Sequence, residues 1–396
     1  MLTDFSNLGQ VQISPWEDLF KHYFPMGLAA LVVSLVATPI CRVIALKWQI
    51  VDRPDTFLKP HERPIPYLGG IAIYLGWLGG ILFAVLYLDL NMDNGFLIGL
   101  GVAGLLTMLV GLFDDLRFMP PKVKLACNIA IALFLLWLGL GNEMVQVVTH
   151  IMRVDMSGSD RWLQLAYSVP IMVFIVVGAC NATNLIDGMD GLCTGVLGII
   201  SIGFLILAGH LRLYSDLPVD NERLVLAVAM LGAAAGFLPF NINPAKIFMG
   251  DAGSMLLGLN AAILMLLFAE EKSIRWMMGA LMVFGLPIAD MLLTLARRWR
   301  NGRPLMEGDR SHFYDQLRDR GYTVRQVVAI SYLLTIGFVL SGLSVIVFRT
   351  RHAILLILLT VAASVVAVWK FNMVSIDPRS PAGSGDTDTE KKGVGL

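Results

Sequence analysis

The chain has 396 residues, of which 56% are hydrophobic and 15% are charged, and its basic and acidic residues balance to a net charge of zero. A soluble protein carries about 25% charged residues, so this composition excludes an ordinary soluble domain and indicates an integral membrane protein. The zero net charge also lacks the basic excess of a nucleic-acid-binding protein, and no nucleic-acid partner is expected.

Apolar segments of about 17–24 residues recur along the chain, which is the length that a helix needs to cross a bilayer. Helices satisfy their own backbone groups, as the water-free interior of a bilayer requires. We therefore predict an all-α, polytopic integral membrane protein of about 11 transmembrane helices. The predicted spans are 24–46, 66–88, 96–113, 125–141, 167–182, 192–210, 224–240, 253–269, 276–295, 325–348 and 353–371.

The basic residues of the connections predict the orientation. With the N-terminus outside, the inside segments contain 18 lysine and arginine residues and the outside segments contain 9. Cytoplasmic connections carry such an excess, so the N-terminus is expected outside and the C-terminus in the cytoplasm. The chain then divides into an extracytoplasmic segment (1–23), a transmembrane domain (24–371) and a cytoplasmic tail (372–396), whose polar composition predicts disorder.

Polar residues gather in the connections on the predicted inside, beginning with the one before the second span. There, Lys59, His61 and Arg63 precede Gly69 and Gly70. The three side chains form a ready anion site, although a membrane-flanking basic loop explains them equally well.

The third span ends on the adjacent carboxylates Asp114 and Asp115. The C-terminal end of a helix is negative, so cations should compensate them. Lys122 and Lys124 follow closely, and a divalent ion would act in the same way. Because neighbouring helical residues point about 100° apart, we expect one aspartate to matter more than the other. A solvated helix end is the alternative.

The connection between the fifth and sixth spans contains Asn184, Asp187 and Asp190. On a helical turn, Asp187 and Asp190 share a face, and Gly188 and Gly191 allow close approach by a ligand. A capped turn is the alternative. These groups exceed what a cap requires, so a functional role is favoured.

Asn241 and Asp251 lie in the connection before the eighth span, which Asp251 opens. The simplest interpretation of Asp251 is the N-cap of that helix. Mg²⁺, however, prefers one or two carboxylates together with waters and substrate phosphates. Five aspartates on the inside face meet that preference: Asp114, Asp115, Asp187, Asp190 and Asp251.

The longest inside connection between spans, 296–324, is also the most basic and contains His312. Its first arginines are explained by flanking charge, and a lone histidine is more often structural than catalytic. Asp290, inside the ninth span, lies about two turns from Arg297 on the same face, so we expect it to brace that arginine.

Together, acids able to hold Mg²⁺ face basic groups able to hold a diphosphate, at the membrane surface and beside apolar helices. This arrangement suits phosphoryl transfer between a water-soluble nucleotide and a lipid. A transporter or lipid flippase is the alternative from another class. Transporters tend to bind near the bilayer midplane, whereas these acids lie at span ends.

At these motifs the sequence resembles the polyprenyl-phosphate N-acetylhexosamine-1-phosphate transferases, a superfamily that also contains phospho-MurNAc-pentapeptide transferase. The strings NATNLIDGMDGL and FNINPAKIFMGDAGS are the longest and most specific points of likeness. The likeness covers about residues 24–371. The matching stretches are 59–70, 113–124, 181–191, 240–258 and 297–321.

The resemblance implies a ten- or eleven-span helical fold in a bacterial inner (plasma) membrane with a cytoplasmic active site. It implies transfer of N-acetylhexosamine 1-phosphate from a UDP-sugar to undecaprenyl or another polyprenyl phosphate, with UMP released. Mg²⁺ is the implied cofactor, with Mn²⁺ as a substitute, and a homodimer is left open. Carried onto this chain, the catalytic residues are Asp114, Asp115 and Asp187, and the metal ligands are Asp190 and Asp251. The substrate-binding residues are Lys59, Lys122, Lys124, Asn184, Asn241, Arg310 and His312.

One departure from the family pattern concerns the donor. The hexosamine branch usually has His-x-His-His in its C-terminal loop, and this chain has His312-Phe313-Tyr314-Asp315. Arg310 still resembles that branch, so we expect UDP-GlcNAc as the donor, with a pentapeptide-bearing muramyl donor as the alternative. Phe313 and Tyr314 are expected to stack on a sugar or uracil face.

Overall fold

The computed structural model describes residues 15–52, 64–88, 92–117, 119–141, 161–214, 221–269, 273–302 and 312–374. These residues are almost entirely helical, which confirms the predicted fold class. A two-residue antiparallel pair, β1 (Val51–Asp52) and β2 (Ile65–Pro66), was not predicted. The helices are α1 (Pro15–Lys47), α2 (Gly69–Tyr87), α3 (Asn94–Leu116), α4 (Pro121–Trp137), α6 (Arg161–Ile186), α7 (Leu192–Tyr214), α8 (Glu222–Asn241), α9 (Gly250–Ala269), α10 (Ile274–Val283), α11 (Gly285–Arg300), α12 (Phe313–Asp319), α13 (Val324–Val347) and α14 (Thr350–Lys370).

Each predicted span overlaps a helix, but the count of eleven is not reproduced. Among the described residues, nine helices are long and apolar enough to cross a membrane, or ten if the bent pair α10 and α11 forms one span. Helix α4 occupies the position of the fourth predicted span but has only 17 residues. The orientation of the chain in the membrane stays a prediction.

The ninth predicted span, 276–295, is wrong as a straight helix. Helices α10 and α11 meet at Phe284 with a bend of 74°. Pro287 lies in the first turn of α11, and proline has no N–H to offer the carbonyl four residues earlier. The helical hydrogen bond to Val283, the last residue of α10, is therefore missing at the break.

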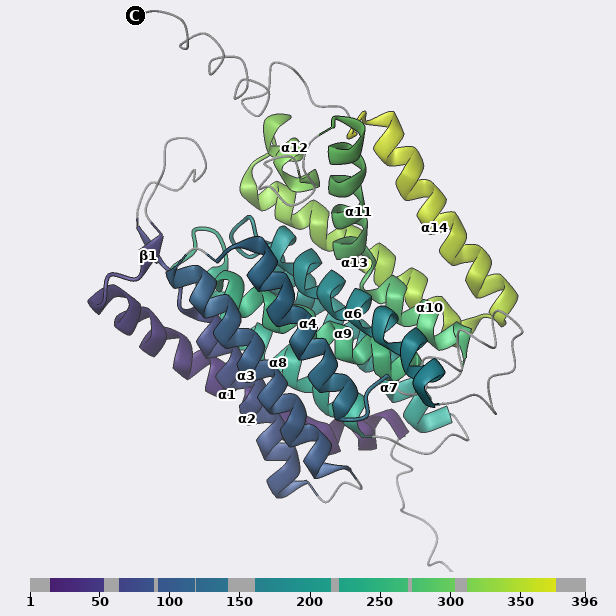
Figure 1. The fold of residues 1–396 in the computed structure, drawn as a ribbon, viewed down its shortest axis with the longest axis horizontal. Coiled ribbons are helices and arrows are strands. Elements are labelled where there is room, and N and C mark those ends of the chain that lie inside the picture. Colours follow the sequence, from purple (N-terminus) through teal and green to yellow (C-terminus); the bar gives the residue numbers. More distant parts are fainter. Residues whose placement is uncertain are drawn as a thin grey trace, which may run out of the picture.

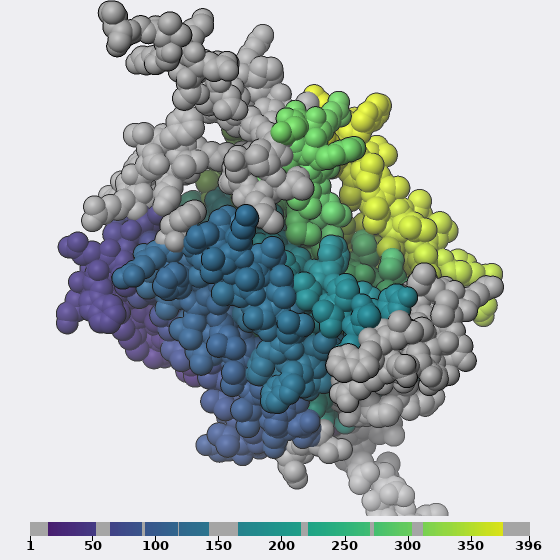
Figure 2. Space-filling view, viewed as in Figure 1, coloured from purple at the N-terminus to yellow at the C-terminus, as the bar shows by residue number. Residues whose placement is uncertain are grey.

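Helix α9 is the central helix of the bundle, and its membrane-spanning window is buried along its whole length. It packs against α2, α3 and α6, while α14 lies at the rim with most of its surface exposed (Figure 1). In the space-filling view, α1 and α14 lie at opposite edges of the visible face (Figure 2). The start of α9 therefore lies among several other helices, and it contacts the end of α3 and the start of α4.

Candidate active site

The first turn of α9 is held in place by backbone hydrogen bonds from the entry to α2. The amide of Phe248 donates to Pro66 O at 2.8 Å, and the amides of Gly69 and Gly70 donate to Phe248 O and Met249 O at 3.0 and 2.9 Å. These bonds fix the segment that leads into Asp251, which is the second residue of α9.

Asp115, at the end of α3, caps α9 from outside its own helix. Its carboxylate accepts from the amides of Asp251 (2.9 Å) and Ala252 (3.2 Å). Gly250 makes this possible, because its φ is +67° and an added Cβ would lie 2.4 Å from the Asp115 carboxylate. The alternative that Asp251 is merely the N-cap of its helix is therefore wrong, since Asp115 performs that role.

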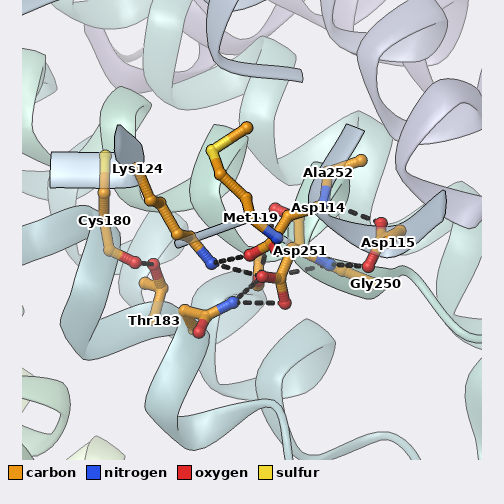
Figure 3. A network of polar contacts seen from close by, with 11 residues as sticks. Asp114, Asp115, Met119, Lys124, Cys180, Thr183, Gly250, Asp251 and Ala252 are labelled. Carbon is orange, nitrogen blue, oxygen red and sulfur yellow. Dashed lines mark hydrogen bonds and ion pairs between the residues drawn. The ribbon is translucent and has the colours of Figure 1, made fainter. Parts of the chain in front are cut away.

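Lys124, near the start of α4, joins two carboxylates of different helices (Figure 3). Its Nζ lies 2.8 Å from Asp114 Oδ2 and also forms an ion pair with Asp251 Oδ2. The other Asp114 oxygen accepts from the amide of Met119 at 2.9 Å. Asn184 Nδ2 donates to Asp251 Oδ1 at 2.6 Å. The side chains of the three ionic groups are mostly buried but keep some solvent access.

The adjacent aspartates therefore have different partners, as the helix geometry predicts. Asp114 pairs with Lys124, while Asp115 binds the backbone of α9. The difference in their contributions to function stays a prediction.

Asp187, in the turn after α6, has no hydrogen-bond partner for its carboxylate among the described residues. Burial raises the pKa of Asp187 well above its usual range, and the carboxylates of Asp251, Asp115 and Asp190 raise this pKa further. An uncompensated carboxylate among other carboxylates is stabilised by a cation.

The carboxylates around Asp251 could supply some, but not all, of the ligands of a magnesium ion. Within the described parts of the chain, no three His, Cys, Asp or Glu side chains lie close enough to hold one ion. Mg²⁺ requires only one or two carboxylates when substrate phosphates and waters complete its shell. The carboxylates that a magnesium ion would use are Asp187, which has no described partner, and Asp251, whose two oxygens already accept from Lys124 and Asn184.

Asp190 and Asn241 instead hold the connection between α8 and α9. Asp190 Oδ2 accepts from Asn243 Nδ2 and from the amide of Ala245, both at 2.9 Å. The buried Asn241 side chain accepts from Gly191 N and Thr194 Oγ1 and donates to Ile247 O. This geometry favours a structural role for Asn241 over the predicted substrate contact. Asp190 was predicted as a metal ligand, and one of its two carboxylate oxygens is instead occupied by these hydrogen bonds.

Asp290 binds His312 and does not serve as the predicted brace of Arg297. Its Oδ2 lies 2.9 Å from His312 Nδ1, and its Oδ1 accepts from the amide of Phe313 at 3.1 Å. The His312 ring stacks on Tyr314, with centroids 5.3 Å apart. Tyr314 in turn donates to Leu185 O at 2.8 Å.

The chain from Asp290 thus reaches the turn that carries Asn184 and Asp187. The Tyr314 ring packs on Gly188 so closely that an added Cβ there would lie 2.2 Å from the hydroxyl oxygen. Tyr314 was predicted to stack on a ligand, and its positioning contact was missed.

Three further residues were predicted to bind substrate: Lys59, Lys122 and Arg310. Lys122 is exposed on the first turn of α4. Lys59 and Arg310 lie outside the described residues.

Asp315, on α12, predicts a pH effect on stability. Burial raises its pKa to about 6, and Asp290 and Asp319 add to the rise while His312 opposes it. Between pH of about 4, the ordinary aspartate pKa, and pH of about 6, the folded chain retains a proton that the unfolded chain loses. Stability should therefore fall as pH rises through this window. Asp315→Asn should raise the melting temperature at pH 7.5 by about 2 °C.

The measurement is a thermal unfolding series from pH 4.5 to 7.5, with Asp18→Asn, at an exposed position on α1, as the control. The wild type and Asp315→Asn should converge at the acidic end. Parallel curves for the two proteins at every pH would contradict this prediction.

Sequence comparisons identify the proteins that this chain resembles. Residues 97–269 match the family model described as glycosyl transferase family 4. The chain is 32% identical over 326 residues to a probable undecaprenyl-phosphate N-acetylglucosaminyl 1-phosphate transferase of Bacillus subtilis, covering 82% of this chain and 84% of that one. It is 32% identical over 360 residues to the decaprenyl-phosphate N-acetylglucosaminephosphotransferase of Mycobacterium tuberculosis, covering 85% and 86%. It is 29% identical over 348 residues to a phospho-N-acetylmuramoyl-pentapeptide-transferase of Chlorobium luteolum, covering 82% and 92%.

Proposed function

The chain belongs to the polyprenyl-phosphate N-acetylhexosamine-1-phosphate transferases of glycosyl transferase family 4, and on that premise we propose that it transfers N-acetylglucosamine 1-phosphate from UDP-GlcNAc to a polyprenyl phosphate. UMP is the second product. The N-acetylglucosamine phosphate transferases of Bacillus subtilis and Mycobacterium tuberculosis support this sugar, since their identity to the chain is higher than that of the pentapeptide transferase.

One observation carries the proposal: Lys124 joins Asp114 and Asp251 at the start of the central helix. The cluster lies where membrane helices end, so a lipid phosphate and a nucleotide from water can meet there. A fixed cation between carboxylates stabilises charge that moves between phosphate oxygens, and such stabilisation is the main requirement of phosphoryl transfer.

In the proposed reaction, an oxygen of the polyprenyl phosphate attacks the β-phosphorus of UDP-GlcNAc in line with the leaving UMP. A new O–P bond forms, the bond between that phosphorus and the oxygen bridging to UMP breaks, and UMP departs with the electron pair. The second pKa of a phosphate monoester is about 6, so the attacking group is largely a dianion at neutral pH. It therefore needs positioning more than deprotonation.

The residues of the cluster supply that positioning. Lys124 offsets phosphate charge, Asn184 orients the Asp251 carboxylate, and Asp115 keeps the first turn of α9 in place. Mg²⁺, when bound at Asp251 and Asp187, would neutralise the diphosphate and strengthen UMP as a leaving group. His312, whose Nδ1 is held by Asp290, is proposed to contact the donor.

The donor identity is tested with purified protein, Mg²⁺ and undecaprenyl phosphate. UDP-GlcNAc and UDP-MurNAc-pentapeptide are supplied side by side at equal concentration, and lipid-linked product and UMP are quantified. We expect turnover of UDP-GlcNAc. Preference for the pentapeptide donor would assign the chain to the muramyl branch, and uptake of label into vesicles without UMP release would support the transporter alternative.

The proposed location is the bacterial inner membrane, with the cluster on the cytoplasmic side. The excess of basic residues in the connections next to the cluster supports this orientation. A membrane-impermeant thiol reagent should label Asp93→Cys in intact cells but label Lys122→Cys, at an exposed position, only after permeabilisation. Labelling of Lys122→Cys in sealed cells would contradict the proposed orientation.

Tyr314→Phe tests the positioning of the Asp187 turn. The change removes the hydrogen bond to Leu185 O and retains the ring on Gly188. Loss of one hydrogen bond costs about 1 kcal/mol, and a loosened turn should reduce turnover roughly 10-fold to 100-fold. Tyr322→Phe, at an exposed position beyond α12, is the control. Equal turnover of the two variants would mean that the hydroxyl does not position the turn.

A further inference from the structure

Three basic residues converge on the connection between α8 and α9, on elements far apart in sequence. Arg42 of α1 donates from Nε to Lys246 O at 3.2 Å. Arg325 of α13 donates from a terminal guanidinium nitrogen to Asn243 O, also at 3.2 Å. With Lys246 itself, these residues form a cationic cluster, and all three are exposed.

The three charges of this cationic cluster are not neutralised within the described part of the chain. No ion pair joins Arg42, Lys246 or Arg325 to a carboxylate there. Each guanidinium makes a single described hydrogen bond to a carbonyl, so each keeps further N–H donors that have no described partner. No described hydrogen bond or ion pair joins these three cations to Lys124, Asp114 or Asp251, the centre of the proposed active site.

The cationic cluster lies where helices long and apolar enough to cross a membrane begin or end, which is the level expected for lipid headgroups. It gathers the end of α1, the end of α8 and the start of α13, and Ile242 beside it is half exposed. Below Arg42, α1 presents an exposed apolar row, and below Arg325, α13 presents another. These rows are Leu28 and Leu35 on α1, and Leu333, Ile336 and Leu340 on α13.

We propose that the cationic cluster binds the headgroup of an anionic glycerophospholipid, whose acyl chains lie along the apolar rows of α1 and α13. Unpaired cations at the level of the headgroups attract anionic lipids. The two-chain lipid fits two apolar surfaces that flank one charged site. The proposal depends on membrane insertion and not on the transferase reaction.

The bound lipid would also act on the proposed active site. The loop that Arg42 and Arg325 hold supplies Asn243 and Ala245, which donate to Asp190 Oδ2. A headgroup on the outer side of this loop would keep it against α1 and α13. Anionic lipid is therefore expected to stabilise the loop that positions Asp190.

The test is native mass spectrometry of the full chain in detergent, titrated with phosphatidylglycerol and, separately, with phosphatidylcholine. The wild type should retain phosphatidylglycerol in preference to phosphatidylcholine. The double variant Arg42→Gln with Arg325→Gln should bind phosphatidylglycerol roughly 25-fold more weakly, because each cation near a headgroup contributes about fivefold. Lys47→Gln is the matched control, an exposed cation on the same helix that faces away from the cluster.

A second double variant separates charge from loop structure. Arg42→Lys with Arg325→Lys retains both charges and should retain phosphatidylglycerol. Equal loss in the glutamine and lysine pairs would overturn the proposal, because the arginines would then act through their bonds to the loop alone. Displacement of the bound phosphatidylglycerol by stoichiometric undecaprenyl phosphate or by UMP would also overturn it, since the cluster would then be a substrate site.

Discussion

Replacing Asp251 by asparagine should reduce sugar-phosphate transfer by roughly 10²-fold to 10³-fold while the helical bundle stays folded. One oxygen of the Asp251 carboxylate forms an ion pair with Lys124, and the other accepts a hydrogen bond from Asn184. Asp251 is therefore the centre of the polar network. An amide of the same shape preserves the packing of α9 but removes the negative charge. It is also a much weaker ligand for Mg²⁺ than a carboxylate.

The measurement is turnover of UDP-GlcNAc at saturating undecaprenyl phosphate, with a melting curve for each protein. Asp93→Asn is the control, because Asp93 caps the opposite end of α3 through Phe96 N and asparagine caps equally well. Chelation of divalent ions should also stop the wild type, and Mg²⁺ or Mn²⁺ should restore it. Undiminished transfer by Asp251→Asn would reduce this residue to a structural role in the first turn of α9.

The helices were predictable because the bilayer imposes one length and one composition on every span. The break between α10 and α11 was not predicted, because the apolar segment continues through Phe284 and amino-acid composition does not reveal a bend. Pro287 was the available signal. The β1–β2 pair was also missed, since two-residue strands leave no alternating pattern.

The members of the candidate site were predictable as charges at the ends of spans, where a membrane protein has no structural need for so many acids. Their individual roles required three-dimensional contacts. Asp115 caps a helix that begins 135 residues later, and Asn241 is fully occupied by Gly191, Thr194 and Ile247. Such pairings join distant parts of the chain, and no local spacing encodes them.

Aromatic residues near the site were the hardest to interpret. The sequence favoured Tyr314 as a stacking surface, whereas its hydroxyl binds the backbone beside Asp187. Gly188 was the only local signal, because a glycine between two functional acids indicates that another group approaches closely. That group proved to be Tyr314 itself.

Lys124→Gln should cause a second large loss, roughly 10²-fold to 10³-fold in turnover. Lys124 forms ion pairs with both Asp114 and Asp251. Glutamine retains a hydrogen-bond donor but no charge, so the two carboxylates would repel each other and the phosphates would lose a positive partner. Loss of one partner from a mostly buried ion pair also destabilises the fold, so the melting temperature should fall as well.

Lys122→Gln provides the matched comparison for this loss. Lys122 lies two residues earlier on the same helix and was predicted from sequence as an equal phosphate-binding candidate, yet its side chain is exposed. An exposed charge acts mainly through long-range attraction that salt screens, so Lys122→Gln should lose at most about threefold, and raising the salt concentration should remove the difference from wild type. The loss in Lys124→Gln should persist at every salt concentration. Equal losses in the two variants would show that general positive charge near α4, and not the ion pair with Asp114 and Asp251, supports the transfer.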